Sequence, residues 1–418
     1  MIEGGSLKWG LFKSSQWTAL WLFFIVQTIL SMGTYTISVV APFLKNDWNY
    51  SRTQIGSLTS AIFLGALMSS FLIGWITKKS NPKKTTILTG FLLGTALVIF
   101  PYSGIFALSF IAMLIAGFSY GIFNPTSTLA LVHWFEPRKR GTAIAVKQTG
   151  VTLGAGFSAI FISYIISHTG KWQYSYLWIV VLLLLSVFCF FLFYEDVLPS
   201  EQQKGTTENK GNWLTILKNR NVIFGSLASL ILAGIQYTFA AHFVLYLTNE
   251  NKMSFSITTM AVFIAQIAGS AGKLWWGLIS DFVFKGKRKG VFITICGLST
   301  IALAGFGFVY PHMSVLILMI LVSIFGFTSL GYAGIFMTFL SESGSSSQMG
   351  TALGIGSMFM YIGILIFPPL SGWIADVAGS YRYVWFGLSG ITIVATILLS
   401  CTKEPSTAAI LTENEKIL

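Results

Sequence analysis

Residues 173–194 read QYSYLWIVVLLLLSVFCFFLFY, an unbroken apolar and aromatic run without a charged side chain. A helix of this length crosses the roughly 30 Å hydrocarbon core of a bilayer, whereas a membrane-spanning strand would alternate over about ten residues. The run therefore predicts a membrane-spanning helix. It ends where the charged pair Glu195 and Asp196 follows.

Similar runs recur along the whole chain, separated by polar or Gly- and Pro-containing breaks. The twelve predicted spans are 17–42, 53–77, 84–101, 105–134, 141–168, 173–194, 221–248, 256–280, 290–310, 313–341, 349–375 and 382–401. The polar segment EQQKGTTENKGN at 201–212 separates the sixth span from the seventh. We therefore expect an N-terminal six-helix bundle over 1–194, a linker over 195–220, a C-terminal bundle over 221–401 and a tail over 402–418.

The composition excludes several other classes of protein. With 54% hydrophobic residues, 10% charged residues and a mean hydropathy of +0.74, the chain is too apolar for a water-soluble domain. Its net charge of +12 comes from short basic clusters between the apolar runs, which does not favour nucleic acid as a partner. Cys189, Cys296 and Cys401 lie far apart and indicate neither a disulfide framework nor a metal site. We expect no catalytic residues, no cofactor and no enzyme activity.

The basic clusters predict how the chain lies in the membrane. If the spans alternate, KKSNPKK at 78–84, RKR at 138–140 and KGKRKG at 285–290 all fall on one side. Loops rich in Lys and Arg stay on the cytoplasmic side of a cell membrane. We therefore expect a multi-pass cell-membrane protein with both termini cytoplasmic.

The two halves of the chain resemble each other. RGTAIAVKQTG at 140–150 aligns with MGTALGIGSMF at 349–359, and GKWQYSYLW at 170–178 aligns with GSYRYVWFG at 379–387 at the same offset. Internal repeats of membrane helices are typical of carriers whose site lies between the repeats, near mid-membrane. The expected fold class is an all-α membrane protein with two pseudo-symmetric six-helix bundles.

Two loops carry a resemblance to a known family. GLISDFVFKGKR at 277–288 is similar to the signature loop of the major facilitator superfamily, in which a Gly, an Asp and spaced basic residues follow the second and eighth spans. GWITKKSNPKK at 74–84 keeps the Gly and the bases but has Lys78 in place of the Asp. The resemblance implies that these loops hold helix ends together, although both loops could instead serve only to fix topology. The residues expected to act in gating are Gly74, Lys78, Lys79, Gly277, Asp281 and Arg288.

A longer stretch narrows the resemblance. YGIFNPTSTLALVHWFEPRKRGTAIAVKQTGVTLG at 120–154 resembles the oxalate/formate antiporters and their monocarboxylate-transporter relatives. Those families place an Arg four residues before the second loop Gly, where this chain has Lys273. The antiporters' second cation aligns with Gly356, and the internal repeat places Lys147 at the symmetry-related position. The resemblance implies a small organic anion as substrate.

Lys147 and Lys273 also stand out without the resemblance, because a cation inside an apolar run is costly and indicates function. Lys147 shares a helix face with Gly150, Gly154 and Ser158, and Lys273 shares one with Gln266 and Gly269. Small and polar faces pack against neighbouring helices or line a cavity. The alternative is that each side chain snorkels over roughly 9 to 12 Å to the cytoplasm.

Neutral polar groups inside the spans complete the candidate site. The expected substrate-binding residues are Lys147, Lys273, Tyr35, Tyr120, Asn124, Gln148, Gln266, Tyr332 and Tyr361, within a wider polar set that includes Gln236 and Tyr237. No Asp or Glu lies in the middle of a span, so His242 is the candidate for proton coupling. Pro125, Pro368 and Pro369 are expected to bend their helices and to assist gating.

These features together predict a secondary active or facilitative transporter of small organic anions, mono- or dicarboxylates, that works by alternating access. The expected partners are the anionic substrate, the lipid bilayer and either protons or a counter-transported anion, with the chain acting as a monomer. Two alternatives remain: an exporter of amphipathic or lipophilic compounds, which the 15% aromatic content favours, and a transport-inactive sensor of the same fold.

Overall fold

The computed structural model describes residues 15–79, 81–196, 216, 218–343 and 348–404, with the backbone alone for 73–79 and 137–138. The first half consists of α1 (Gln16–Trp48), α2 (Arg52–Lys79), α3 (Pro82–Ile99), the 3-10 turn η1 (Phe100–Tyr102), α4 (Phe106–Trp134), α5 (Pro137–Thr169) and α6 (Gln173–Phe193). The second half consists of α8 (Arg220–Leu245), the π-helical turn η3 (Tyr246–Glu250), α9 (Phe255–Phe282), α10 (Arg288–Gly307), α11 (Val315–Phe325), the π-helical turn η4 (Gly326–Leu330), α12 (Ala333–Ser341), α13 (Met349–Ala378) and α14 (Arg382–Ser400).

Twelve helices of the described chain are long and apolar enough to cross a membrane, which confirms the predicted fold class. Two spans continue through π-helical turns: α8 with η3, and α11 with η4 and α12. Some helices begin earlier than the hydropathy predicts. In α5, Pro137 occupies the first helical turn, where a missing N–H costs nothing, so the helix starts before its apolar run does.

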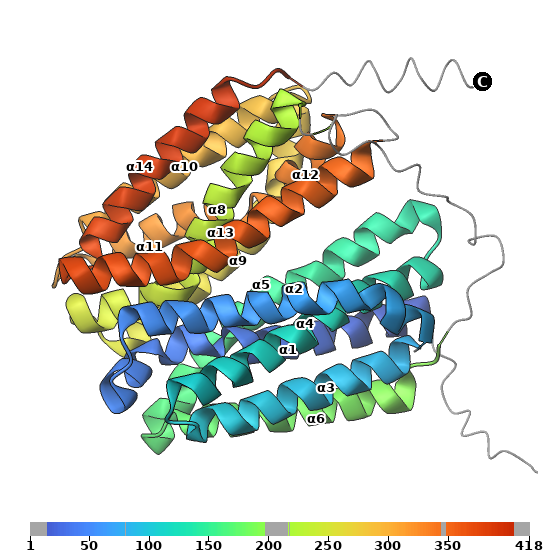
Figure 1. Cartoon of the computed structure of the whole chain (residues 1–418), viewed down its shortest axis with the longest axis horizontal. Coiled ribbons are helices and arrows are strands. Elements are labelled where there is room, and N and C mark those ends of the chain that lie inside the picture. Colours follow the sequence, from blue (N-terminus) through green and yellow to red (C-terminus); the bar gives the residue numbers. More distant parts are fainter. Residues whose placement is uncertain (1–14, 80, 197–215, 217, 344–347, 405–418) are drawn as a thin grey trace, which may run out of the picture.

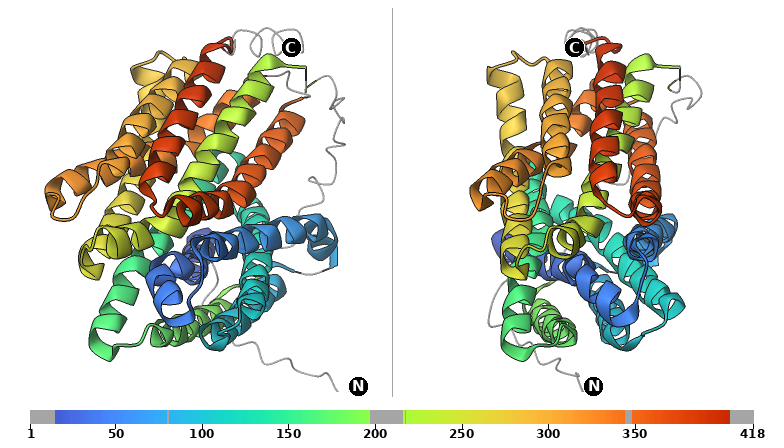
Figure 2. Two further views of the ribbon diagram at one scale, coloured as in Figure 1. Left: turned by 60° about the vertical axis from the view of Figure 1, so that its left-hand side comes forward. Right: turned by 90° about the vertical axis from the view of Figure 1, so that its left-hand side faces the viewer.

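The helices form two bundles, α1 to α6 and α8 to α14 (Figures 1 and 2). The helix ends that carry the clusters at 78–84, 138–140 and 285–290 are called the basic end, and the opposite ends are called the Arg52 end. At the Arg52 end α2 and α13 lie side by side, and toward the basic end their ribbons diverge (Figure 1). Most of the predicted linker at 195–220 and tail at 402–418 lies outside the described residues.

Close contacts between backbones hold each bundle together. In the first bundle α2 and α4 meet so tightly at Gly117 that a Cβ there would collide with the carbonyl of Ile62. In the second bundle α9 meets η4 in the same way, because a Cβ on Gly326 would collide with the carbonyl of Ala265. Small residues at helix interfaces allow such approach in membranes. The two contacts relate corresponding helices of the repeat.

The glycine contact predicts a large difference between two otherwise similar substitutions. Gly117→Ala should lower thermal stability by about 1 to 3 kcal/mol, because the added methyl group overpacks the α2–α4 contact. Gly297→Ala in α10, where no atom lies within 4 Å of the new Cβ, should leave stability unchanged or raise it by about 0.5 to 1 kcal/mol. Thermal melting of the two purified variants in detergent checks this. Equal melting temperatures would contradict the packing argument.

Candidate functional site

Lys147 lies inside the first bundle, on the face of α5 that packs against α4. Its side chain is fully buried, and Nζ donates to Asn124 Oδ1 at 2.8 Å, to the Asn124 carbonyl at 3.2 Å, and to the hydroxyls of Ser127 and Thr128 at 3.0 Å each. All four acceptors are neutral oxygens. The ammonium group therefore neither faces lipid nor snorkels to the membrane surface, and it has more acceptors than its three N–H groups require.

Asn124 connects Lys147 to a second predicted residue. The Nε2 group of Gln148 donates to Asn124 Oδ1 at 3.1 Å, so that one amide oxygen receives bonds from both side chains. Lys147 and Gln148 are neighbours in sequence but point in different directions around α5, and Asn124 lies between them on α4. The structure therefore brings three of the predicted site residues together.

Gly356 on α13 occupies the position that the internal repeat relates to Lys147 on α5. A Cβ on Gly356 would meet Leu340 and Phe336 of α12. Position 356 on α13 thus faces α12, as position 147 on α5 faces α4. The two positions correspond in space as well as in the aligned repeat.

Lys273 lies on α9, close to the interface between the halves. One turn earlier on the same helix, the hydroxyl of Ser270 forms a hydrogen bond with the hydroxyl of Thr152 on α5. Lys273 is partly buried and has no hydrogen-bond or ion-pair partner among the described residues. Its ammonium group therefore has no protein acceptor in the described part of the chain.

The two lysines lie at comparable depth. From the Thr152–Ser270 bond, Lys273 is displaced by about 4.5 Å along α9 and Lys147 by about 7.5 Å along α5, both toward the basic end. Each half thus contributes one cation near the same level of the interface. Lys147 is enclosed by its own bundle, whereas Lys273 is not.

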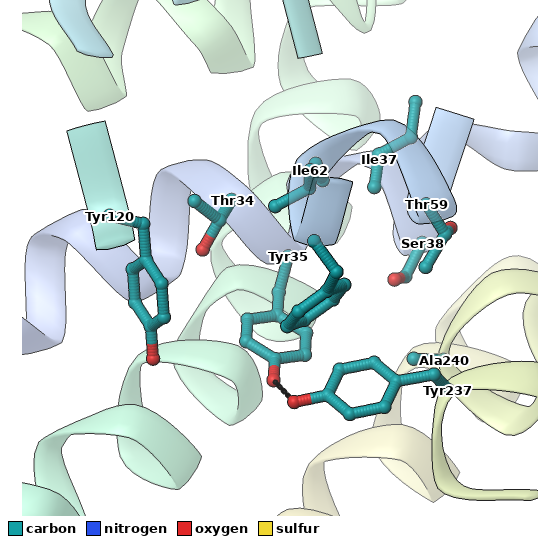
Figure 3. Close-up of a pocket in the computed structure, with 10 residues that line it drawn as sticks. Thr34, Tyr35, Ile37, Ser38, Thr59, Ile62, Tyr120, Tyr237 and Ala240 are labelled. Atoms are coloured by element: carbon teal, nitrogen blue, oxygen red, sulfur yellow. Dashed lines mark hydrogen bonds between the residues drawn. The ribbon is translucent and has the colours of Figure 1, made fainter. Parts of the chain in front are cut away.

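A group of tyrosines joins the halves near the middle of the helices. The hydroxyls of Tyr35 on α1 and Tyr237 on α8 lie 3.2 Å apart and point at each other (Figure 3). The ring of Phe63 on α2 packs edge-on against Tyr237 at a centroid distance of 4.2 Å. Tyr237 belonged only to the wider polar set, but it is the residue that Tyr35 contacts across the interface.

Two small cavities adjoin this tyrosine pair. The first is lined by Thr34, Tyr35, Ile37, Ser38, Thr59, Ile62, Phe63, Tyr120, Tyr237 and Ala240 (Figure 3). The second shares Tyr35, Ser38 and Ala240 with the first and includes the predicted Gln266. Each has a volume of about 10 Å³, which is room for about one water molecule. The halves are therefore closed around the tyrosines in this state.

Two other predicted tyrosines make no hydrogen bond across the interface among the described residues. Tyr332 is fully buried inside the second bundle, where its ring stacks on Phe292 and its hydroxyl lies 3.5 Å from Ser229. Tyr361 is partly buried on α13 and has no hydrogen-bond partner among the described residues.

His242 is fully buried near the Arg52 end, far from the lysines in sequence and in depth. Its Nε2 lies 2.8 Å from the carbonyl of Pro368, and its Nδ1 lies 2.8 Å from the hydroxyl of Tyr381. Because a carbonyl only accepts, Nε2 must carry a proton. Burial raises the pKa of Tyr381, in the loop before α14, well above its usual value, so its hydroxyl keeps its proton. Tyr381 can therefore donate to Nδ1 of a neutral His242.

The expected gating loops are described only in part. In the second half, Arg288 pairs with Asp281 and lies 3.3 Å from Glu342, so that it links the ends of α9 and α12 to the start of α10. Gly277 has open space where a Cβ would stand. For Gly74, Lys78 and Lys79 only the backbone is described.

Sequence reasoning missed the contact that closes the Arg52 end, here named the Arg52 lock. The guanidinium of Arg52 on α2 pairs with Glu250 at 2.8 Å and donates to the carbonyl of Ala375 on α13. In return, the carboxylate of Asp376 accepts the backbone N–H groups of Arg52 and Thr53 at 3.1 and 2.9 Å. The sequence did contain a signal for this contact, because Arg52 stands at the start of a span on the side of the membrane with few basic residues.

Comparison with known families identifies the architecture. Residues 23–351 and 227–416 match the family described as Major Facilitator Superfamily. The chain belongs to this superfamily. It is therefore a multi-pass membrane transporter and not a member of an enzyme family.

Curated relatives align over nearly the whole transporter. A hexuronate transporter of Bacillus subtilis (strain 168) is 24% identical over 409 residues, covering 93% of this chain and 94% of the relative. A glycerol-3-phosphate transporter of the same organism is 22% identical and covers 86% of each. A probable galactarate/D-glucarate transporter, also from that strain, is 21% identical and covers 92% of each.

Solved structures share the fold. A bacterial homolog to the human lysosomal transporter Spinster, crystallised in an inward-facing and occupied conformation, has a TM-score of 0.76 at 14% identity, covering 93% of this chain and 97% of that one. The nucleoside transporter NupG has a TM-score of 0.73 at 15% identity, covering 91% of this chain and 98% of that one. At these identities the likeness concerns the fold alone.

The different surroundings of the two lysines predict different costs of charge reversal. Lys147→Glu should lower the stability of the transporter by about 3 to 5 kcal/mol, because it buries a carboxylate against two oxygens of Asn124 that cannot donate to it. Lys273→Glu should remain folded, because its position is partly exposed. Thermal melting in detergent distinguishes the two variants. A Lys273→Glu variant that melts as low as Lys147→Glu would contradict the difference in burial between the two positions.

Proposed function

We propose that this transporter carries small organic anions, mono- or dicarboxylates, by alternating access of a site between its two bundles. The observation that carries the proposal is Lys273, a cation beside the inter-bundle interface without a partner among the described residues. A charge in a membrane span is maintained at a cost and is normally paired. A bound carboxylate would supply the missing partner.

Lys147 acts on the substrate through its neighbours in this proposal. Its ammonium group is bound to Asn124, and Asn124 in turn accepts from Gln148. The lysine thereby fixes both amides and adds positive potential near the interface. Lys147 does not itself contact the substrate in this proposal, because all three of its N–H groups have acceptors within the first bundle.

Neutral hydroxyl groups supply the remaining contacts. Tyr35 and Tyr237 share a hydrogen bond that a substrate hydroxyl or carboxylate could replace, and Tyr120 and Gln266 line the adjoining cavities. Tyr361 lies on α13, in the second bundle. Tyr332 lies inside the same bundle, where its hydroxyl contacts Ser229, and we assign it a supporting role.

The names of the relatives support an anionic substrate. Hexuronate, glycerol 3-phosphate and galactarate or D-glucarate all carry at least one negative charge at neutral pH, and the transporters named for them match most of this chain. The resemblance to the oxalate/formate antiporter and monocarboxylate branch points the same way. Arginine is absent from the middle of every span, so the binding cation is a lysine, which acts as a point charge.

The orientation that we propose rests on the positive-inside rule. With the basic end and both termini in the cytoplasm, the Arg52 lock lies on the outer side, and the described state is closed to the outside. Opening the lock while the basic end closes would complete the cycle. His242, which is hydrogen-bonded to the carbonyl of Pro368 on α13, remains the candidate for proton coupling. Exchange for a counter-transported anion is the alternative mode of coupling.

Substitution of Lys273 tests the proposal. In proteoliposomes, counterflow of a labelled carboxylate should fall about 10- to 100-fold for Lys273→Gln, as expected for the loss of one charge-assisted contact. Lys273→Arg should keep part of the activity, because it keeps the charge. Lys171→Gln, an equal loss of charge at an exposed position of the Arg52 end, should transport as the wild type does.

Three outcomes separate the candidate functions. Carboxylate counterflow that disappears with Lys273→Gln supports the anion carrier. Efflux of a lipophilic dye without carboxylate counterflow supports the exporter, and the absence of both supports the sensor. Wild-type carboxylate counterflow by Lys273→Gln would remove Lys273 from the site.

A further inference from the structure

Two consecutive prolines interrupt the hydrogen bonding of α13. Pro368 and Pro369 lie inside this helix, which nevertheless continues from Met349 to Ala378. Proline has no N–H, so the carbonyls four residues earlier, on Ile364 and Leu365, lose their helical donors. In a membrane interior such carbonyls need a donor from elsewhere.

The donor comes from the other bundle. The hydroxyl of Ser60 on α2 lies 2.8 Å from the carbonyl of Leu365 and 3.4 Å from that of Ile364. Ser60 is 9% exposed, so water does not replace it readily. The two carbonyls that the prolines leave without donors are therefore the two that Ser60 reaches.

Glycine makes this approach possible. One turn before Ser60, a Cβ on Gly56 would collide with the carbonyl of Pro368. That carbonyl already accepts from Nε2 of His242, which belongs to its own bundle. The His242 bond can thus persist when the bundles separate, whereas the Ser60 bonds exist only while α2 and α13 are in contact.

We propose that Ser60 and the Pro368–Pro369 pair form a latch that stabilises the state closed at the Arg52 end and that releases when the bundles separate there. The proposal rests on alternating access as proposed above. Ser60 is a positioning residue, since it contacts the opposite helix and no substrate. The prolines create the acceptors, and the serine donates its one O–H to them, mainly to the Leu365 carbonyl, in one state only.

A matched pair of serines on α2 tests the latch. Ser60→Ala removes the hydroxyl that donates from the other bundle and should raise the ratio of open to closed Arg52 ends about fivefold, the effect of one net hydrogen bond. Ser57→Ala, one turn away, removes a hydroxyl that donates to Thr53 of its own helix at 2.8 Å and should change nothing. Ser60→Thr keeps the hydroxyl and should behave as the wild type.

The state can be read from a distance between spin labels, without any substrate. Cys189, Cys296 and Cys401 are first replaced. One label is then attached to each bundle at the Arg52 end, at Tyr102→Cys and Tyr310→Cys, where the native side chains are 63% and 60% exposed. Pulsed electron paramagnetic resonance in lipid nanodiscs should show a larger long-distance population for Ser60→Ala alone. An unchanged distribution in Ser60→Ala, or an equal change in Ser57→Ala, overturns the proposal.

A double-mutant comparison examines the role of the prolines. Pro368→Ala with Pro369→Ala returns two N–H donors to α13, so adding Ser60→Ala to that variant should have no further effect. A fivefold change in both backgrounds would overturn the claim that the prolines create the acceptors. If the proline variant does not fold, the comparison of Ser60 with Ser57 decides alone. If the wild-type protein transports no carboxylate, the anion proposal fails. The label distances need no substrate and would still test the latch.

Discussion

The structure depends on pairing charged and backbone groups across the contact between its bundles, and the Arg52 end shows this most directly. The N-terminus of α2 has free N–H groups, and the C-terminus of α13 has free carbonyls. Asp376 accepts from the first, while Arg52 donates to the carbonyls of Ala375 and Gly379. Each helix end thereby satisfies the other. The bundles are thus joined at this end by bonds between the terminal groups of α2 and α13.

The lysines follow the same rule with opposite results. Lys147 finds its acceptors on α4 of its own bundle and is complete without a ligand. Lys273 has no partner among the described residues, although it lies only one turn from the Thr152–Ser270 contact with α5. The two halves therefore each carry one such lysine, and they differ in whether its ammonium group already has hydrogen-bond acceptors. A substrate anion would complete the second half and leave the first unchanged.

Much of this was predictable from the sequence, for physical reasons. Hydropathy predicted the twelve spans, and the cost of a cation inside a membrane span singled out both lysines as candidates. The partners were not predictable, because Ser60, Arg52 and Glu250 acquire their roles only when helices distant in sequence meet. Tyr332 shows the same limit, since helical spacing identifies a polar group but not which of two adjacent faces it occupies around a π-helical turn.

The glycine contacts within each bundle have a mechanical consequence. At Gly117 and Gly326 backbone touches backbone, with no side chain that could change rotamer to absorb a displacement. Each bundle must then behave as a stiff lever, and the contacts at Tyr35–Tyr237 and Thr152–Ser270 lie near the pivot between the two. In the alternating-access cycle proposed above, a few ångströms of separation at one end of such levers would be transmitted as approach at the other, so that the two ends would not open widely together.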